Sequence, residues 1–194
     1  REQVERFLRG AEQVERSGFS VPMRHICDSA GSEYYPEYHF DAVRLGRRLF
    51  MDHPTQPRGN IRECASWRSC ITAVHRRAAG DKLGYGGVYT LDHDADIATV
   101  GVGYGDGLYL PLVEMHGDIL VRGERRPLLA CCMDQCMVDV TGMNVQVGEE
   151  VTFFGYDRAG HALLSQDVAN FCGANEGCAL TAALSQRVER IIEN

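Results

Sequence analysis

Several patterns that would assign a protein to a class are absent from this sequence. Its eight cysteines include no CxxC pair and its seven histidines no HxxxH pair, so no metal site is predicted. No apolar run approaches the about 20 residues that cross a bilayer, and we expect no signal peptide at the start. A formal net charge of −7 argues against nucleic acid as the main partner. At 194 residues, the chain fits one sizeable domain or two small ones.

The cysteines have two interpretations. No two of them have zinc-ribbon or redox spacing, and Cys131 and Cys132 are adjacent in the chain. We expect them to be reduced, mostly buried thiols of a cytosolic protein, and a disulfide framework is the alternative.

The first 50 residues show the order of alternating helices and strands. Apolar residues form one stripe of an amphipathic helix over residues 2–17, with Gly18 at its C-terminal cap. Residues 22–27 (PMRHIC) and 42–45 are each expected to form a short buried strand, which is typical of an α/β barrel or a doubly wound sheet. Because the chain opens at Arg1 inside the helical pattern, we expect it to be a piece of a longer protein.

After Phe50 the sequence changes from alternating helix and strand patterns to mostly strand patterns. The segment 51–60 (MDHPTQPRGN), with two prolines and a glycine, is the expected linker. Short apolar runs separated by glycine-rich or charged turns then predict an all-β domain. The expected strands are 61–77, 97–103, 118–122, 127–133, 137–140 and 151–156, and short helices are expected at 166–172 and 176–184.

Two tyrosines stand between glycines. They are Tyr85 in KLGYGGVYT and Tyr104 in VGVGYGDG. Glycine costs stability inside a strand, so a tyrosine in this setting suits presentation to a ligand or a partner better than core packing. Two hairpin turns with incidental aromatic side chains are the alternative.

Several longer blocks occur in one order along the chain. They are HICDSAG, VRLGRRLF, GDKLGYGGVYT, IATVGVGYGDG, CCMDQCMVDV, GEEVTFFG and the closing ANEGCALTAALSQRVERI. Together they resemble the C-terminal half of alanine racemases over essentially the whole chain, closest to the vancomycin-resistance type of serine/alanine racemase. The resemblance implies an α/β plus all-β fold. Residues 1–55 would be the last strand–helix units of a (β/α)8 barrel, and residues 56–194 a β-rich C-terminal domain, in a head-to-tail homodimer.

The resemblance also implies a bound pyridoxal 5′-phosphate. The hydroxyl of Ser29 and the backbone N–H groups of Gly46 and Arg47 would hold its phosphate, which barrels bind in the loops after their last strands. Arg44 resembles the arginine that faces the pyridine nitrogen, and His25 would bond to Arg44. Because an arginine stays protonated, it can only donate a hydrogen bond to the pyridine nitrogen, which must then be neutral. A neutral ring favours return of the proton to Cα over transamination or elimination. An ordinary loop serine and a core histidine are the alternatives for Ser29 and His25.

Racemisation needs a base on each face of Cα. The resemblance assigns one base to a lysine and the other to Tyr85, which would act across the dimer. A free phenol has a pKa of about 10, so the partner barrel would have to supply cations and hydrogen bonds that favour ionisation. Met133 resembles the residue whose backbone N–H meets the substrate carboxylate, with core packing as its alternative. Tyr104 resembles a narrowing of the substrate entrance.

The chain also departs from the family pattern. The blocks with the Schiff-base lysine and with the arginine that pairs with the substrate carboxylate would precede Arg1, so this piece alone is expected to be inactive. Asp28 stands where asparagine is usual, which puts a loop hydrogen bond there in question. Asn175 stands where the alanine enzymes carry a tyrosine near the phosphate. The smaller side chain leaves room and a hydrogen-bond partner for a serine hydroxyl, which indicates the serine-active branch.

These residues predict part of a racemase that interconverts the enantiomers of serine and alanine. Such an enzyme would supply D-amino acids for peptidoglycan precursors and glycopeptide resistance. We expect it on the cytoplasmic side, with attachment to a membrane through a preceding domain as an open alternative. We also expect the piece to associate with the missing N-terminal barrel half or with a copy of itself. The rival hypotheses are a non-catalytic β-rich binding or dimerisation module and a cofactor-binding homologue without turnover.

Overall fold

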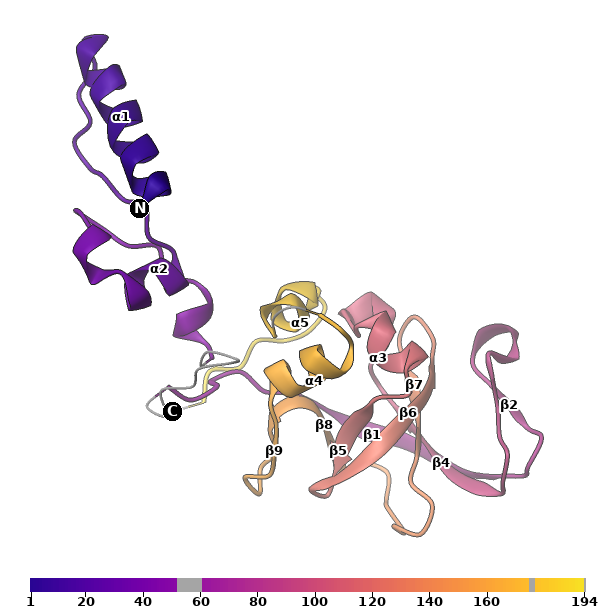
Figure 1. Cartoon of the computed structure of the whole chain (residues 1–194). Coiled ribbons are helices and arrows are strands. Elements are labelled where there is room, and N and C mark those ends of the chain that lie inside the picture. The colour runs from indigo at the N-terminus through magenta and orange to yellow at the C-terminus, as the bar shows by residue number, and fades with distance from the viewer. Residues whose placement is uncertain (52–60, 175–176, 194) are drawn as a thin grey trace. The chain divides into compact units, whose positions relative to one another are not determined.

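The computed structural model describes residues 1–51, 61–174 and 177–193. The chain divides into two compact units, Arg1–Arg62 and Glu63–Asn194 (Figure 1). Apart from its first residue, the expected linker 51–60 lies outside the described residues. None of the helices in the described part is long and apolar enough to cross a lipid bilayer.

The first unit opens with the amphipathic helix that the sequence predicts. Helix α1 spans Glu2–Arg16 and ends just before Gly18. Ala11 is buried, and the Phe7 ring packs on Phe40 with the ring centroids 5.6 Å apart. The apolar stripe of α1 therefore packs against a later segment of the same unit.

The two strands expected in this unit are not formed, so both predictions are wrong. Residues 22–27 and 42–45 instead lie beside each other, joined by isolated backbone hydrogen bonds such as Arg44 N–H to Cys27 O (2.9 Å). A parallel ladder becomes regular when each strand has neighbours that continue the bonding pattern. Among the described residues of this unit, these two segments bond to no further strand, which explains their irregular backbone.

Between and after these segments the chain forms short helical turns. They are α2 at Ser29–Tyr34, η1 at Pro36–Tyr38 and η2 at Arg47–Leu49. The Arg48 guanidinium donates to the Glu33 carboxylate, with Nε 2.7 Å from Oε2. This ion pair holds η2 beside α2.

The second unit is the all-β domain that the sequence predicts. Its larger sheet has the strand order β1-β4-β7-β6-β5-β8-β9, and β1 also pairs with β8, so the strands from β1 round to β8 close into a barrel. Every pairing in this sheet is antiparallel. The strands are β1 (Trp67–Arg77), β4 (Ala95–Val100), β5 (Asp118–Val121), β6 (Glu124–Cys131), β7 (Cys136–Asp139), β8 (Glu150–Tyr156) and β9 (Ala162–Leu163).

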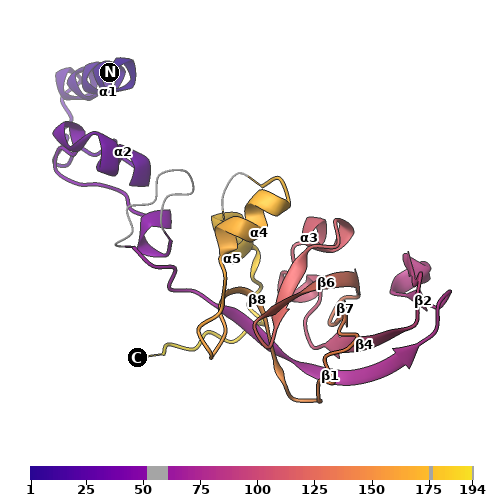
Figure 2. The same ribbon diagram turned by 60° about the horizontal axis from the view of Figure 1, so that its bottom comes forward.

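The long strand β1 closes the barrel because its two halves have different neighbours. Residues 67–70 pair with β8 and residues 71–77 pair with β4, and Figure 2 shows β1 as a long, curved strand. The predicted range 61–77 is therefore too long at its start. The other predicted strands are confirmed to within a few residues, and the predicted strand 137–140 corresponds to β7.

Apolar side chains from different strands fill the barrel. Ile71, Ile119 and Leu128 are fully buried, and the Trp67 and Phe153 rings lie 4.8 Å apart. Burial of each such side chain stabilises the fold by about 1.5–3 kcal/mol. The barrel is thus a packed core, which leaves its turns to carry any ligand.

Short helices and a small hairpin complete the described part of this unit. Helices α4 (Ser165–Phe171) and α5 (Cys178–Ala183) lie together in Figure 1 and confirm the two helices predicted near the end of the chain. Helix α3 (Leu110–Glu114), which begins with a Leu-Pro pair, was not predicted. Strands β2 (Lys82–Leu83) and β3 (Tyr89–Thr90) form a separate hairpin.

The expectation for the cysteines had two parts, namely that they are reduced and that most of them are buried. Cys136 and Cys132 are buried, whereas Cys70 is exposed and Cys131 is intermediate. The expectation of mostly buried cysteines is therefore only partly correct. The free thiols include Cys27, Cys70, Cys131, Cys132, Cys136 and Cys172.

Candidate active site

The β2–β3 hairpin presents Tyr85 on a glycine-flanked turn. The turn η3 (Tyr85–Gly87) joins the two strands, and the Tyr85 side chain is 61% exposed. Gly84 has a φ of 73°, a backbone conformation that residues other than glycine rarely adopt. A Cβ on Gly84 would lie 3.0 Å from the Cβ of Ala130 in β6. The glycine therefore lets the turn sit directly on β6 while the phenol remains exposed.

A second turn, η4 (Tyr104–Asp106), holds Tyr104 against the hairpin between β6 and β7. Tyr104 N–H donates to Cys132 O (3.2 Å), and Gly105 N–H donates to Met133 O (2.8 Å). The two predicted substrate residues, Tyr104 and Met133, are thus brought together. Their side chains are 44% and 50% exposed, so a ligand can reach both.

The Tyr85 turn and the Tyr104 turn share one end of β6. Gly84 packs on Ala130, near the last residue of that strand, and the Tyr104 turn is bonded to Cys132, which follows it. Tyr85, on the separate β2–β3 hairpin, is therefore carried by a turn that neighbours the turns of the larger sheet with Tyr104 and Met133.

Sequence reasoning missed the residue that closes the Tyr104 turn. The Asp106 carboxylate accepts a hydrogen bond from Gly103 N–H, with Oδ2 2.9 Å from the nitrogen. The signal was present in GYGDG, because a side chain that bonds back to the first N–H of a helical turn is a capping arrangement.

In the first unit, two of the predicted phosphate ligands meet. Gly46 N–H donates to Ser29 Oγ at 3.0 Å, although the residues are 17 positions apart. Ser29 is buried at the start of α2, and Asp28 caps this helix by accepting from Gly31 N–H (2.8 Å). The carboxylate of Asp28 therefore makes the loop hydrogen bond that was in question. Arg47 follows Gly46 as the first residue of η2.

The expected hydrogen bond between Arg44 and His25 is not formed. Arg44 is exposed, and its Nη2 donates to Ile26 O at 3.2 Å. The His25 Nδ1 atom is buried and has no hydrogen-bond partner in the described part of the chain. Asn175, the predicted specificity residue, lies outside the described residues.

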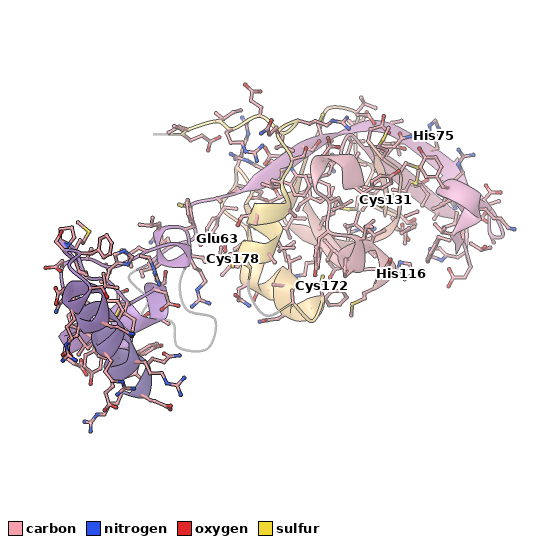
Figure 3. The ribbon with its side chains drawn as sticks, turned by 90° about the horizontal axis from the view of Figure 1, so that it is seen from above. Glu63, His75, His116, Cys131, Cys172 and Cys178 are labelled. Atoms are coloured by element: carbon pink, nitrogen blue, oxygen red, sulfur yellow. The ribbon has the colours of Figure 1, made fainter. Side chains whose placement is uncertain are left out.

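Burial disfavours the ionised form of two thiols near the Met133 hairpin. It raises the pKa of the Cys131 and Cys136 thiols above their ordinary value. Cys131 lies among the strands of the second unit (Figure 3). Burial, with a smaller effect of nearby carboxylates, also raises the pKa of Tyr89. A thiolate nucleophile at Cys131 or Cys136 is therefore disfavoured.

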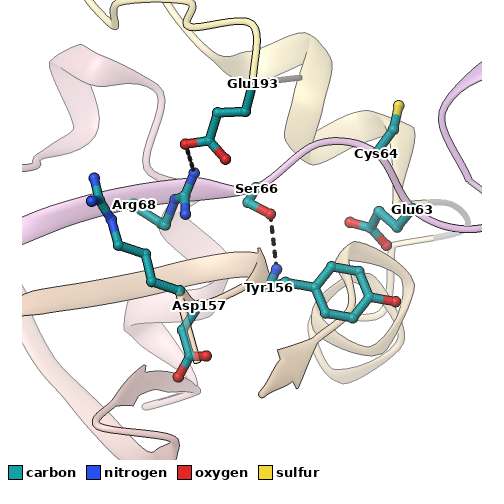
Figure 4. A pocket seen from close by; sticks show the side chains of 8 residues that line it. Glu63, Cys64, Ser66, Arg68, Tyr156, Asp157 and Glu193 are labelled. Carbon is teal, nitrogen blue, oxygen red and sulfur yellow. Dashed lines mark hydrogen bonds and ion pairs between the residues drawn. The ribbon is translucent and has the colours of Figure 1, made fainter. Parts of the chain in front are cut away.

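A hollow of about 480 Å³ in the second unit contains none of the predicted site residues. The Arg68–Glu193 ion pair (2.6 Å) and the hydrogen bond from Tyr156 N–H to Ser66 Oγ (2.9 Å) lie in it (Figure 4). Because the protein itself satisfies these polar groups, we do not assign the site to this hollow. It is lined by Glu63, Cys64, Ser66, Arg68, Tyr156, Asp157, Arg158 and Glu193.

Comparison with known proteins places both units in one family. Residues 64–192 match the family described as "Alanine racemase, C-terminal domain", and residues 1–54 match "Alanine racemase, N-terminal domain". The alanine racemase of Desulforamulus reducens is 35% identical over 177 residues, which cover 88% of this chain and 46% of the relative. The alanine racemase of Deinococcus deserti is 42% identical over 125 residues, which cover 64% of this chain and 34% of the relative.

The fold agrees with solved structures as well. The structure of alanine racemase from Streptomyces coelicolor A3(2) superposes with a TM-score of 0.83 at 26% identity, over 97% of this chain and 50% of that one. The chain thus spans about half or less of the length of these relatives. Because the family match covers most of its length and agrees with the fold, the chain belongs to the alanine racemase family.

Proposed function

We propose that this chain is the C-terminal part of a pyridoxal-phosphate-dependent racemase that inverts Cα of a small amino acid, with Tyr85 as one of its two bases. The observation that supports this most is the exposed Tyr85 phenol, on a turn seated on β6 beside the Met133 hairpin. A phenol held in this way can meet a substrate that lies outside its own unit. This suits a base that acts on the other protomer of a head-to-tail homodimer.

The residues of the first unit fit the phosphate of the cofactor. The Gly46 N–H donates to Ser29 Oγ at 3.0 Å, which keeps these two groups together, and Arg47 follows at the start of a helical turn. A hydroxyl together with successive backbone N–H groups is a donor set that binds phosphate. When bound, pyridoxal phosphate supplies an electron-withdrawing ring that acidifies the Cα proton of the amino acid.

Arg44 would face the ring nitrogen of the cofactor. Among the described residues its guanidinium makes one hydrogen bond, to Ile26 O, so further N–H donors are available. Because a guanidinium stays protonated, Arg44 can donate a hydrogen bond but leaves the ring nitrogen neutral. A neutral ring withdraws less charge, which favours return of the proton to Cα over transamination or elimination.

The turns of the second unit would bind and deprotonate the substrate. Tyr85 Oη would take or return the proton on one face of Cα, and a lysine outside this chain would serve the other face. The Met133 N–H makes no backbone hydrogen bond in the described part of the chain, so it is available to the substrate carboxylate. Tyr104, bonded to the same hairpin, would narrow the entrance and exclude water and larger amino acids.

The test of this mechanism is Tyr85→Phe in the complete enzyme. The variant should bind the cofactor normally but lose about 10²–10⁴-fold in racemisation rate, because one proton-transfer route is gone. Exchange of the Cα hydrogen in heavy water should slow far more for one enantiomer than for the other. Tyr35→Phe, which alters another exposed tyrosine, is the matched control. Equal slowing of both enantiomers would refute the assignment of Tyr85 as a one-face base.

We further propose that the substrates include serine as well as alanine. The support is Asn175, which replaces a tyrosine of the alanine enzymes and offers a serine hydroxyl both space and a hydrogen-bond partner. Such an enzyme would provide D-amino acids for peptidoglycan precursors and glycopeptide resistance, on the cytoplasmic side of the membrane.

Asn175→Tyr in the complete enzyme tests this preference. A hydrogen bond to a serine hydroxyl contributes about 0.5–1.5 kcal/mol. The serine-to-alanine ratio of kcat/KM should therefore fall by roughly 2- to 13-fold, and by more if the ring also clashes with the substrate. Alanine activity should hold or rise. An unchanged ratio would show that residues outside this chain set the preference.

A further inference from the structure

The C-terminal segment of the chain packs on the turn that carries Tyr104. Ser185 N–H donates to Asp106 O at 3.0 Å, and the Arg187 Nε lies 3.3 Å from Asp106 Oδ1. The segment is itself fixed, because the Arg190 guanidinium donates to Leu184 O (3.1 Å) and to Ser185 O (2.6 Å). The Tyr104 turn is therefore bonded to the C-terminal segment as well as to the Met133 hairpin, and a Cβ on Gly105 would lie 2.9 Å from Arg187 Nη1 and 2.8 Å from Met133 O.

Asp106 joins its own turn to the C-terminal segment through separate oxygens of one carboxylate. Oδ2 accepts from Gly103 N–H at 2.9 Å, and Oδ1 pairs with Arg187. The Asp106 side chain is only 13% exposed, whereas that of Arg187 is 55% exposed. A carboxylate with little access to water depends on these partners, so the ion pair fixes both its position and that of the turn.

The same turn fixes the position of the substrate residues. Its Tyr104 and Gly105 N–H groups donate to Cys132 O and Met133 O, so any movement of the turn moves or releases the hairpin. Three parts of the chain thus meet in this region, namely the segment with Arg187, the turn with Asp106 and Tyr104, and the hairpin with Met133.

We propose that Asp106 and Arg187 are positioning residues for the substrate entrance formed by Tyr104 and Met133. The pair acts through the Tyr104 turn, which it clamps on the hairpin. This inference rests on the proposed racemase function, since that function makes Tyr104 and Met133 substrate residues. Tyr85 is carried by a different turn, so loosening the clamp weakens substrate binding more than it slows proton transfer.

The test compares Asp106→Asn, Arg187→Met and the double variant in the complete enzyme. Asparagine keeps an oxygen for Gly103 N–H and removes the charge, whereas methionine keeps the length of Arg187 and removes the guanidinium. Each single variant should raise KM by about two- to fivefold with little change in kcat. Because both changes break one contact, the double variant should match the singles. Arg187→Lys, which retains the positive charge, should recover part of the loss.

Hydrogen exchange provides a readout that does not require activity. The Gly105 amide, which donates to Met133 O, should exchange faster in both variants. Arg76→Met is the matched control, because Arg76 also lies 3.3 Å from a carboxylate, that of Asp96, and its side chain is 58% exposed. Asp96 is at the opposite end of β4 from the Tyr104 turn, so this variant should leave KM and Gly105 exchange unchanged.

Three results would overturn the clamp. KM values that move in opposite directions would mean that the two charges steer the substrate as independent ions. Additive effects in the double variant would mean that Asp106 and Arg187 do not act together. Unchanged Gly105 exchange would mean that the pair does not hold the turn. If the unaltered complete enzyme shows no racemisation, the proposed function fails, and Gly105 exchange still decides whether the clamp exists.

Discussion

Replacing Gly103 by alanine should separate the Tyr104 turn from the hairpin beneath it. A Cβ at this position would lie 2.3 Å from Cys132 O and 2.4 Å from the carbonyl carbon of Met133. Both are backbone atoms of a hairpin that the Cys132 N–H to Gln135 O bond closes at 2.7 Å, so they cannot rotate away as a side chain could. The φ of −137° at Gly103 is allowed for alanine, so the strain comes from the close contact alone.

The size of the effect follows from the rigidity of the contact. Overpacking against atoms that cannot move away costs about 1–3 kcal/mol. If the turn is displaced in the free enzyme, restoring it for binding costs the same free energy, which corresponds to a KM higher by about 5- to 150-fold. The assay is the KM for L- and D-alanine and for both serine enantiomers in the complete enzyme, with thermal unfolding measured in parallel.

Gly101→Ala, two residues earlier, is the matched control. A Cβ there would meet the Thr72 Cγ2 at 3.4 Å and the Ser69 Oγ at 3.9 Å, which are ordinary contacts. This variant should change KM by less than about twofold, since it inserts the same methyl group without a clash. If Gly103→Ala and Gly101→Ala behave alike, the close seating of the Tyr104 turn has no part in substrate binding, and the reasoning is refuted.

Two further predictions concern buried groups of the second unit. Burial raises the pKa of the Glu63 carboxyl above its ordinary value of 4.5. The hydrogen bond that this carboxylate accepts from Ser165 N–H offsets part of the increase. The wild type should therefore lose stability as the pH rises from about 4.5 through the folded-state pKa, and Glu63→Gln should lack this loss in denaturant unfolding at several pH values. Iodoacetamide should label the exposed Cys70 well before Cys136, whose burial raises the pKa of its thiol, and equal labelling by mass spectrometry would contradict the structure.

The elements that the sequence predicted well are those that local pattern determines. The strands of the barrel could be predicted because each is a short apolar run bounded by turn residues, as in the segment that became β8. Helix α1 could be predicted because its apolar stripe has the helical period. The strands expected at 22–27 and 42–45 failed because a parallel strand takes its regularity from neighbours that no local pattern describes.

In the candidate site, too, features set by local sequence could be predicted and features set by distant neighbours could not. Glycines on both sides of Tyr85 and Tyr104 correctly indicated exposed tyrosines on turns. The contact of Tyr104 with Met133 could not be derived, because it depends on how β4 and β6 each pair with β7. The expected bond between His25 and Arg44 was also beyond the pattern, since it required the position of two side chains in irregular backbone.

The dependence on pairing also explains why the site is made of turns that touch backbone to backbone. The Tyr104 turn contacts hairpin peptide groups, and hydrogen bonds to Cys132 O and Met133 O fix it without the rotamer freedom that a side-chain contact would leave. Such a contact requires one fixed strand register. A shift of β6 by one residue against β7 would turn every side chain of β6 to the other face and move the carbonyl groups that receive the Tyr104 and Gly105 N–H groups. The exact register of β6 and β7, with Cys131 opposite Cys136, is therefore part of the candidate site, although neither strand carries a residue that meets the substrate.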